Sequence, residues 1–216
     1  LLEGPLPEDA LIARAFERSA KKFGARILDK KPFQLSNDVR IREQNNVSLM
    51  TAVRGYDVVV IADSDGEFGR YVPYQTNLPR PVVGTTGLVS QAWHWSFERY
   101  GAPQLNSRFE RKTDRRMTAQ DWAVWVAVKA VVTGVTRARP PEYSKIVEFI
   151  KSDGMRLDGF KGPALNFRPW NNQLRQPVLL ATHNAIIEQA PLDAFLHTTN
   201  DLDTLGADQP DTTCTF

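Results

Sequence analysis

The segment Tyr56–Ala62, YDVVVIA, is an almost unbroken run of β-branched residues. Such a run is typical of a strand that is buried on both faces of a parallel sheet. The segment Pro81–Gly84, PVVG, has the same character and predicts another buried strand. A short helix over Glu67–Leu78, interrupted by Pro73, would connect the two strands. This alternation of strands and helices predicts an α/β fold with a doubly wound parallel sheet.

On the amino-terminal side, Pro7–Phe23 predicts an amphipathic helix that ends at Gly24. A short strand over Arg26–Lys30 and a more polar helix over Asp38–Arg54 are predicted next. Leu1-Leu2 looks like the end of a strand, so we expect that further sequence precedes it. The inward face of the first helix is expected to carry the apolar residues Leu11, Ala15, Phe16, Ala20 and Phe23.

A long helix is predicted over Thr118–Arg137, with Thr118 as its N-cap. A helix that is apolar all round must be buried all round, and this chain offers too few strands to cover one. We therefore expect a partner lobe upstream of Leu1. A further helix is predicted over Glu142–Lys151. The apolar residues of the long helix cover nearly every face: Trp122, Val124, Trp125, Val126, Val128, Val131, Val132 and Val135.

The segment Phe160–Thr182 predicts a hairpin. A strand over Leu165–Phe167 leads into Arg168–Gln173, where proline and two asparagines favour a turn. The second strand, Leu174–Ala181, contains a proline, which restricts it to a sheet edge or a strand start. The polar tail from 191 to 216 is expected to run over the surface.

Composition excludes several classes of partner. The 27 basic and 25 acidic residues leave a net charge of +2, and no basic run is interleaved with aromatic residues, so we expect no nucleic acid. No apolar stretch approaches the roughly 20 residues of a membrane-spanning helix, so we expect no direct membrane insertion. The single cysteine, Cys214, can form neither a disulfide framework nor a metal quartet.

No catalytic set stands out in the sequence. His94, His183 and His197 lack metal-binding spacing, and no serine or cysteine has the neighbours of an activated nucleophile. The chain is therefore predicted to be no enzyme and to need no cofactor.

The order of these elements resembles the second half of a type I periplasmic solute-binding protein of an ABC transporter, the class that includes the Leu/Ile/Val-binding proteins. Four blocks look like one subgroup, the binding protein associated with alcohol oxidation that depends on pyrroloquinoline quinone (PQQ). They are GEFGRYVPY (66–74), LPRPVVGTTGL (78–88), NFRPWNNQLRQPVLL (166–180) and LDTLGADQP (202–210).

The resemblance implies a periplasmic protein that captures a small molecule in an interlobe cleft and delivers it to an ABC transporter permease. The implied ligand is PQQ, an aromatic alcohol or its acid. The resemblance also assigns residues 1–100 and 155–190 to the second lobe, 101–154 to helices of a largely missing first lobe, and 191–216 to a C-terminal tail.

Candidate ligand residues follow the strands, because parallel sheets bind ligands at the carboxyl ends of their strands. The loops after the two buried strands contribute Asp63, Glu67, Thr85 and Thr86. In amino-acid binders of the family, an acidic residue is common at the position of Thr85-Thr86. This sequence has no acidic residue there, which argues against an amino-acid ligand. The aromatic and basic candidates are Trp93, Trp95, Trp122, Arg168 and Trp170.

Each candidate has a structural alternative. Trp93 and Trp95 could cover the sheet edge, Trp122 is favoured as a core residue, and Asp63 with its neighbours could simply form the loop. Asp63, Asp65 and Glu67 also leave open a calcium or lanthanide site, although the pattern departs from an EF-hand. A ligand-sensing or structural module on the same fold is the other open alternative.

Overall fold

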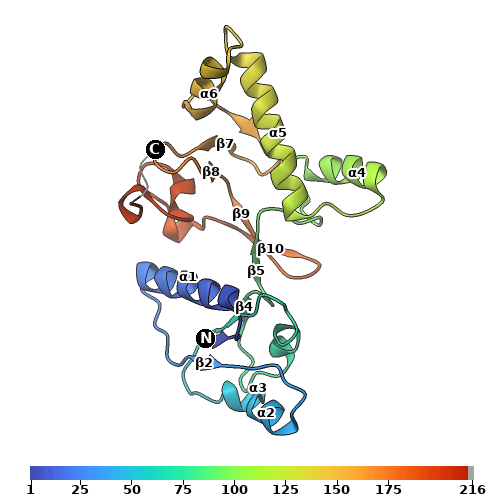
Figure 1. Cartoon of the computed structure of the whole chain (residues 1–216), viewed down its shortest axis with the longest axis vertical. Coiled ribbons are helices and arrows are strands. Elements are labelled where there is room, and N and C mark those ends of the chain that lie inside the picture. The colour runs from blue at the N-terminus through green and yellow to red at the C-terminus, as the bar shows by residue number, and fades with distance from the viewer. Residues whose placement is uncertain (214–216) are drawn as a thin grey trace. The chain divides into compact units, whose positions relative to one another are not determined.

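The structure is a computed structural model that describes residues 1–213, apart from the side chain of Arg42. Cys214 lies outside the described residues. The chain forms two compact units, unit 1 from Leu1 to Val89 and unit 2 from Ser90 onward (Figure 1). Each unit is described by itself below. The predicted assignment of segments to two lobes of a longer protein stays a prediction.

Unit 1 contains a parallel four-stranded sheet with the strand order β2-β1-β3-β4. Leu2 of β1 lies opposite Lys31 of β2 and Ile61 of β3, and Val59 of β3 lies opposite Val82 of β4. All four residues of β3 are buried, which confirms the parallel sheet predicted from YDVVVIA. The strands are β1 (Leu2–Glu3), β2 (Lys31–Pro32), β3 (Val59–Ala62) and β4 (Val82–Gly84).

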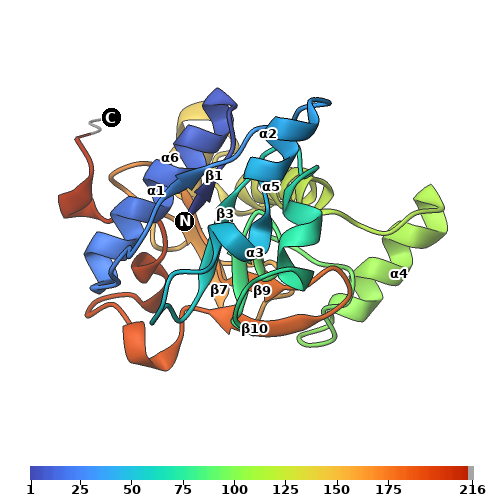
Figure 2. The same cartoon turned by 90° about the horizontal axis from the view of Figure 1, so that it is seen from below.

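Helix α1 (Pro7–Phe23) has the predicted bounds and lies alongside β1 and β3 (Figures 1 and 2). Gly24 ends it in the left-handed conformation, with φ at +73°. The predicted inward face is wrong in part, because Leu11, Ala15 and Phe23 are exposed. Its buried apolar residues are Ala13 and Ala20, since small side chains allow the helix to approach the sheet closely.

Several predicted bounds in unit 1 are also wrong. Arg26–Lys30 forms no strand, and β2 begins only at Lys31. The predicted helix over Asp38–Arg54 is two short helices, α2 (Val39–Gln44) and α3 (Val47–Met50). Asn46 separates them, because its side chain accepts the Leu49 N–H and caps α3. Between β3 and β4, the predicted short helix is a 3₁₀ helix, η1 (Gly69–Tyr74).

Unit 2 contains two three-stranded sheets, in the orders β10-β9-β5 and β6-β7-β8, and the pairs β10–β9, β6–β7 and β7–β8 are antiparallel. The predicted second hairpin strand is two strands, because Gln176 and Pro177 separate β8 from β9. The strands are β5 (Val89–Gln91), β6 (Leu157–Asp158), β7 (Ala164–Phe167), β8 (Leu174–Arg175), β9 (Val178–Ala181) and β10 (Ile186–Ala190). The helices are α4 (Ala102–Thr113), α5 (Ala119–Arg137), α6 (Tyr143–Lys151), and the 3₁₀ helices η2 (Asp193–Phe195), η3 (Asp201–Thr204) and η4 (Gln209–Asp211).

Helix α5 is buried on one face only, so the prediction that it is buried all round is wrong for this structure. Its buried face packs against α6 and β6 and consists of Trp122, Val126, Ala130 and Gly134. A second face, here called the valine face, is 45–65% exposed. It consists of Val124, Val128, Val131, Val132 and Val135, which recur at helical spacing.

The core of unit 2 contains an unusual buried lysine. The Lys161 side chain is fully buried, and its ammonium group lies 3.7 Å from the ring centroid of Trp122. The Nζ atom donates to Gln176 Oε1 at 2.6 Å and to the carbonyl of Pro177 at 3.0 Å. Both acceptors are neutral, and burial lowers the pKa of Lys161 to about 7.

Replacing Lys161 should remove a pH dependence from the stability of unit 2. The lysine has an ordinary pKa of 10.5 when unfolded and about 7 when folded, so the folded state loses its proton first. The free energy of unfolding should therefore rise with pH between these two values, by up to roughly 1.4 kcal/mol per pH unit. Urea unfolding of wild type and Lys161→Met at pH 6, 8 and 10 measures this contribution.

The exposed Lys151 provides the control, because Lys151→Met should keep the wild-type pH dependence. Equal pH dependences for wild type and Lys161→Met would contradict the expectation.

Candidate functional site

The carboxyl ends of three parallel strands meet at one edge of the unit 1 sheet. The Gly4 N–H, after β1, donates to the Ala62 carbonyl at 2.9 Å, and the Thr85 N–H, after β4, donates to the Ile61 carbonyl at 3.0 Å. Asp63 follows β3 directly. The predicted juxtaposition of the loops after β3 and β4 is therefore present within unit 1.

Asp63 and Thr85 contact each other at this edge. The Asp63 N–H donates to Thr85 Oγ1 at 3.1 Å. The Thr85 hydroxyl in turn donates to the Ile61 carbonyl at 3.3 Å. The Asp63 carboxylate is 3% exposed and accepts the N–H groups of Gly66 at 3.2 Å and Gly69 at 2.5 Å. Burial raises the pKa of Asp63; the Gly69 amide opposes that shift.

Gly84 explains how β4 delivers the two threonines so close to β3. Its φ is +116°, and a Cβ atom there would lie 2.2 Å from the Ile61 carbonyl oxygen. Only glycine fits this close backbone approach. The bend at Gly84 thus places the Thr85 hydroxyl between the two strand ends.

Thr86 has the side chain that remains available for a ligand. It is half-buried, and within the described residues no hydrogen bond uses its hydroxyl. A Cβ atom at Gly69 would lie 2.7 Å from Thr86 Oγ1 and 3.0 Å from Asp63 Oδ2, so these groups converge on one small area. Glu67 is exposed in the neighbouring loop.

Asp9 is a member of this edge that sequence reasoning missed. It is 1% exposed in the first turn of α1, and its carboxylate accepts the N–H of Leu6 at 3.0 Å and of Ser64 at 2.6 Å. Burial would raise the pKa of Asp9, but the hydrogen bonds from Ser64 and Leu6 outweigh it and lower the pKa. The only sequence signal was an acidic residue near a helix start.

The acidic side chains of this loop hydrogen-bond to the loop's own backbone. Asp63 accepts two backbone amides, and Asp65 Oδ1 accepts the Glu67 N–H at 2.9 Å. Among residues 1–213, no three His, Cys, Asp or Glu side chains gather so that they could hold a metal ion. These hydrogen bonds give Asp63 and Asp65 a part in forming the loop, and the metal-binding alternative stays a prediction.

A cavity of unit 1 lies away from this edge. It lies among residues at the opposite, amino-terminal ends of β1 and β3, including Leu1, Leu28 and Val58. Asp63 and Thr85 do not line it. Polar groups converge at the strand ends, whereas the lining of the cavity is largely apolar.

The predicted tryptophans of unit 2 are not gathered into one site. Trp93 and Trp122 are buried and lie parallel in the core, with ring centroids 6.1 Å apart. Each indole N–H is bonded to protein, Trp93 to Asn106 Oδ1 at 2.9 Å and Trp122 to the Gly159 carbonyl at 3.0 Å. These contacts are those of core residues, and a ligand role for the pair stays a prediction.

Trp95 is half-buried and makes a different contact. The Arg116 guanidinium lies 3.6 Å from its ring centroid, a short cation–π distance. Arg116 therefore covers one of the two faces of the Trp95 ring on which a flat ligand would stack.

Arg168 belongs to a buried ionic cluster with Arg175 and Asp203. Arg168 Nε donates to Asp203 Oδ1 at 2.9 Å, while Arg175 Nε and Nη2 donate to the two Asp203 oxygens at 2.8 and 2.9 Å. Arg168 also donates to the carbonyls of Leu202 and Leu205. Burial would raise the pKa of Asp203, but its two arginine partners hold it below the ordinary value.

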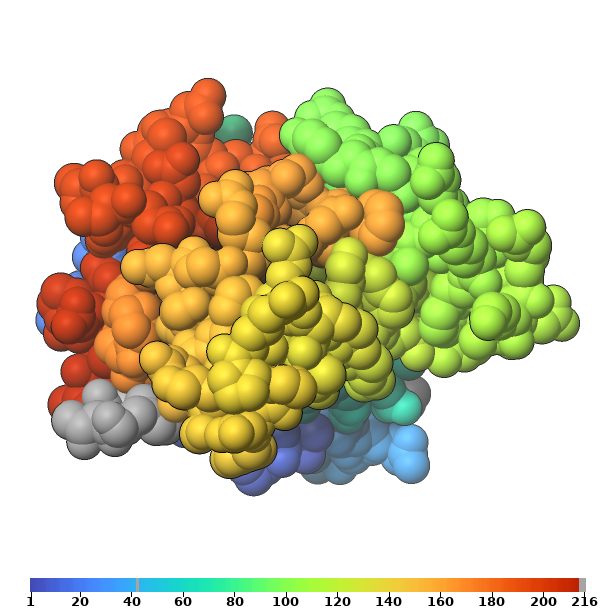
Figure 3. Space-filling view, turned by 90° about the horizontal axis from the view of Figure 1, so that it is seen from above, coloured from blue at the N-terminus to red at the C-terminus, as the bar shows by residue number. Residues whose placement is uncertain are grey.

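Trp170 completes the same region of unit 2. Its indole N–H donates to the Ala207 carbonyl at 3.3 Å, so the hairpin tip lies against the tail rather than in solvent. Figure 3 shows the hairpin in orange and the tail in red on one face of unit 2. The prediction that the tail only runs over the surface is wrong, because Leu202, Asp203 and Thr204 are buried.

Solved structures match the chain, whereas no protein-family model and no curated protein does. A branched-chain amino acid ABC transporter periplasmic ligand-binding protein from Burkholderia xenovorans matches with a TM-score of 0.69 and 13% identity, over 87% of this chain and 57% of that one. An amino acid ABC transporter substrate-binding protein from Pseudomonas fluorescens has a TM-score of 0.64 and 10% identity, over 100% and 61%. A periplasmic binding protein from Burkholderia mallei has a TM-score of 0.63 and 11% identity, over 99% and 60%.

This chain has the type I periplasmic binding protein fold. The predicted fold class is confirmed, and the resemblance is confirmed at the level of the fold. The chain spans about three fifths of the length of these binding proteins. Among its described helices, none is long and apolar enough to cross a membrane.

Removing the charge of Asp203 should destabilise unit 2 of this binding-protein fold. Asp203→Asn leaves two buried guanidinium groups without a counter-charge, which costs about 3–5 kcal/mol. The exposed Asp201→Asn, two residues away, should change the free energy of unfolding by no more than about 0.5 kcal/mol. Urea unfolding of both variants measures these two changes in the free energy of unfolding. Equal changes for Asp203→Asn and Asp201→Asn would contradict a structural role for the cluster.

Proposed function

We propose that this protein is the periplasmic substrate-binding component of an ABC transporter and that it binds a small solute without chemical conversion. The observation that supports this most strongly is the fold likeness, which extends over 83–100% of the chain for proteins described as ABC transporters or as their substrate-binding proteins. Because a fold alone does not determine function, the proposal also needs a site.

The proposed solute-contacting edge is formed by Asp63, Thr85 and Thr86 at the ends of β3 and β4. Thr86 offers a half-buried hydroxyl that has no partner within residues 1–213. The side chains of Asp63 and Thr85 already make hydrogen bonds within the protein. They therefore define the shape of the edge more than they offer hydrogen bonds to a ligand. Open carboxyl ends of parallel strands are the usual ligand position in such sheets.

The proposed ligand is PQQ, an aromatic alcohol or its acid. Support comes from the four sequence blocks that look like the PQQ-associated subgroup, and from the hydroxyl side chains of Thr85 and Thr86 where an amino-acid binder of the family commonly has an acidic residue. The alternative is an amino acid, because the Burkholderia xenovorans and Pseudomonas fluorescens proteins are described as amino-acid transport components.

The valine face supports the proposal that residues 101–154 belong to a lobe completed by further protein. Five valines of one helical face are 45–65% exposed, which is unusual for the solvent side of a helix. The proposed partner of the valine face is the part of a longer binding protein that this chain does not contain. The proposed partner of the whole binding protein is the ABC transporter permease.

Calorimetric titration tests the ligand. We expect heat with PQQ, with an aromatic alcohol or with an aromatic acid, and none with leucine or valine. Thr86→Val should weaken the binding by about tenfold, because it removes one hydrogen bond to the ligand. Thr198→Val, at an exposed position elsewhere, should leave the affinity unchanged. Heat with a branched-chain amino acid alone would exclude the quinone-linked ligand.

The valine face can be tested by comparing two forms of the protein. In this chain the double change Val128→Thr and Val132→Thr should alter the free energy of unfolding by about 0.5 kcal/mol or less, because both side chains are exposed. In a form with a longer amino terminus the same change should cost roughly 1–3 kcal/mol, because the hydroxyls would be buried. Similar costs in the two forms would show that nothing covers this face.

A further inference from the structure

In the loop after β3, backbone N–H groups that could bind an anion already donate to carboxylates of the protein itself. Asp63 accepts the Gly66 N–H at 3.2 Å on one oxygen and the Gly69 N–H at 2.5 Å on the other. The Ser64 N–H donates at 2.6 Å to Asp9, which lies 55 positions earlier in the chain. N–H groups in such loops and at helix starts commonly hold anionic ligands. Here the protein's own carboxylates take that place.

The start of α1 is occupied in the same way. A helix N-terminus attracts negative charge, and the first residue of α1, Pro7, has no N–H to offer a ligand. The N–H of Leu6, just before the helix, donates to Asp9 Oδ2 at 3.0 Å. Gly4 allows this carboxylate to lie against the end of β1, because a Cβ atom at Gly4 would stand 2.2 Å from Asp9 Oδ2. The charge that the helix start favours is therefore supplied from within unit 1.

The two carboxylates repel an anion without offering a contact to a cation. Asp63 is 3% and Asp9 1% exposed, and each of their four oxygens accepts a backbone N–H. A ligand ammonium group would need a carboxylate oxygen within about 4 Å, and burial keeps these oxygens from it. Hydrogen bonds lower the pKa of Asp9, so its negative charge persists at neutral pH. A ligand carboxylate at this edge would meet repulsion, and the N–H groups of Ser64, Gly66 and Gly69 would not be free to compensate it.

Exposed charges in the same loop do not reverse this balance. Arg70 is the only basic residue among positions 63–74. It is exposed, and its Nε donates to the Gly66 carbonyl at 3.3 Å. Solvent screens an exposed charge. Asp65 and Glu67 are exposed as well and carry the opposite charge, so the loop as a whole remains negative.

We propose that this edge selects an uncharged solute that carries a hydroxyl group and that it rejects carboxylates. Thr86 makes the contact, because its half-buried hydroxyl can both donate to and accept from an alcohol group. Asp63 and Asp9 determine specificity without touching the solute, since they occupy the N–H donors and repel anions. This inference rests on the proposed function and narrows its ligand to the aromatic alcohol, because PQQ and the aromatic acid carry carboxylate groups.

One experiment needs no solute and measures whether Asp63 closes the loop to anions. In Asp63→Ala the N–H groups of Gly66 and Gly69 lose their acceptor, so sulfate should bind there. We expect the amide NMR signals of both glycines to titrate with sulfate at least tenfold more tightly than in the wild type. Asp63→Asn removes the charge with little change of shape and should show the same trend, so the test does not depend on whether Asp63→Ala folds.

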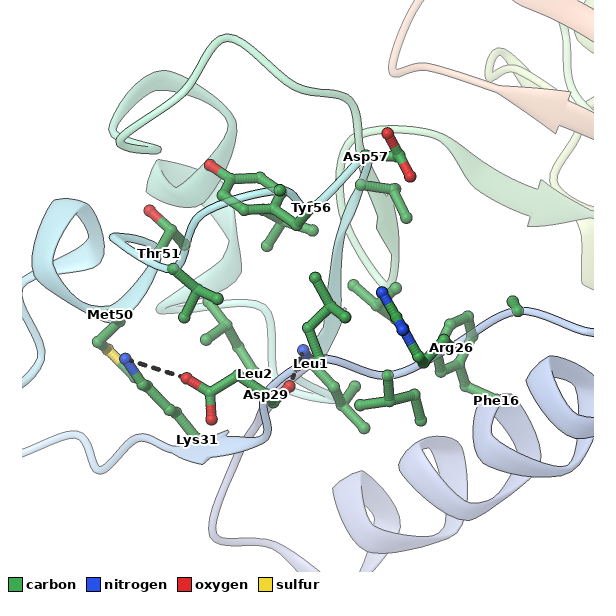
Figure 4. A pocket seen from close by; sticks show the side chains of 18 of the residues that line it. Leu1, Leu2, Phe16, Arg26, Asp29, Lys31, Met50, Thr51, Tyr56 and Asp57 are labelled. Atoms are coloured by element: carbon green, nitrogen blue, oxygen red, sulfur yellow. Dashed lines mark hydrogen bonds and ion pairs between the residues drawn. The ribbon is translucent and has the colours of Figure 1, made fainter.

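Asp57→Ala is the matched control. Asp57 is an exposed carboxylate before β3 and lies beside the cavity at the opposite edge of the sheet (Figure 4). Its loss changes the net charge of unit 1 by the same amount, so a general effect of charge would appear in this variant too. We expect Asp57→Ala to titrate with sulfate as the wild type does. Equal sulfate affinities for the wild type, Asp63→Ala and Asp63→Asn would overturn the inference.

A second experiment compares three solutes of similar shape and different charge, namely benzyl alcohol, benzoate and benzylamine. By calorimetry, the wild type should bind benzyl alcohol at least tenfold more tightly than the other two, and Asp63→Asn should reduce the preference over benzoate at least threefold. Benzoate or benzylamine binding as tightly as the alcohol would overturn the inference. A wild type that binds none of the three would contradict the proposed ligand, and the sulfate titration would still decide whether this edge rejects anions.

Discussion

The main-chain pairing of β3 is the constraint on which unit 1 depends. β3 is paired with β1 on one side and β4 on the other, and all four of its residues are buried. Its polar backbone groups must therefore be satisfied by neighbouring strands rather than by water. This pairing fixes where β3 ends, and thereby places Asp63 beside Thr85 and brings Gly84 against the Ile61 carbonyl.

Local patterns predicted the parts of the fold that local physics determines. The spacing and end residues of Pro7–Phe23 gave the bounds of α1, and the β-branched run gave β3. Predictions failed where a neighbour distant in sequence decides, as at 26–30, where a strand needs a partner, and on α5, where only one face is covered. Of the candidate site, the loops after β3 and β4 were found from the sequence, whereas Asp9 was not, because its role depends on Ser64.

Two of the distinctive sequence blocks lie in unit 2 and contact each other. Blocks 166–180 and 202–210 contact each other through Arg168, Arg175 and Asp203, and through Trp170 and Ala207. The sequence suggested a ligand role for Arg168 because guanidinium groups suit carboxylates. The carboxylate that the structure provides is the protein's own, which composition alone could not reveal.

The ionic cluster also restricts how this protein can change in evolution. Loss of the Asp203 charge leaves two buried guanidinium groups without a counter-charge, whereas joint replacement of all three residues by apolar residues of similar volume is often neutral or stabilising. A change at Asp203 alone therefore passes through a protein of low stability. Related sequences are expected to keep the three residues as a set or to lose them together, so the hairpin and the tail should evolve as one unit.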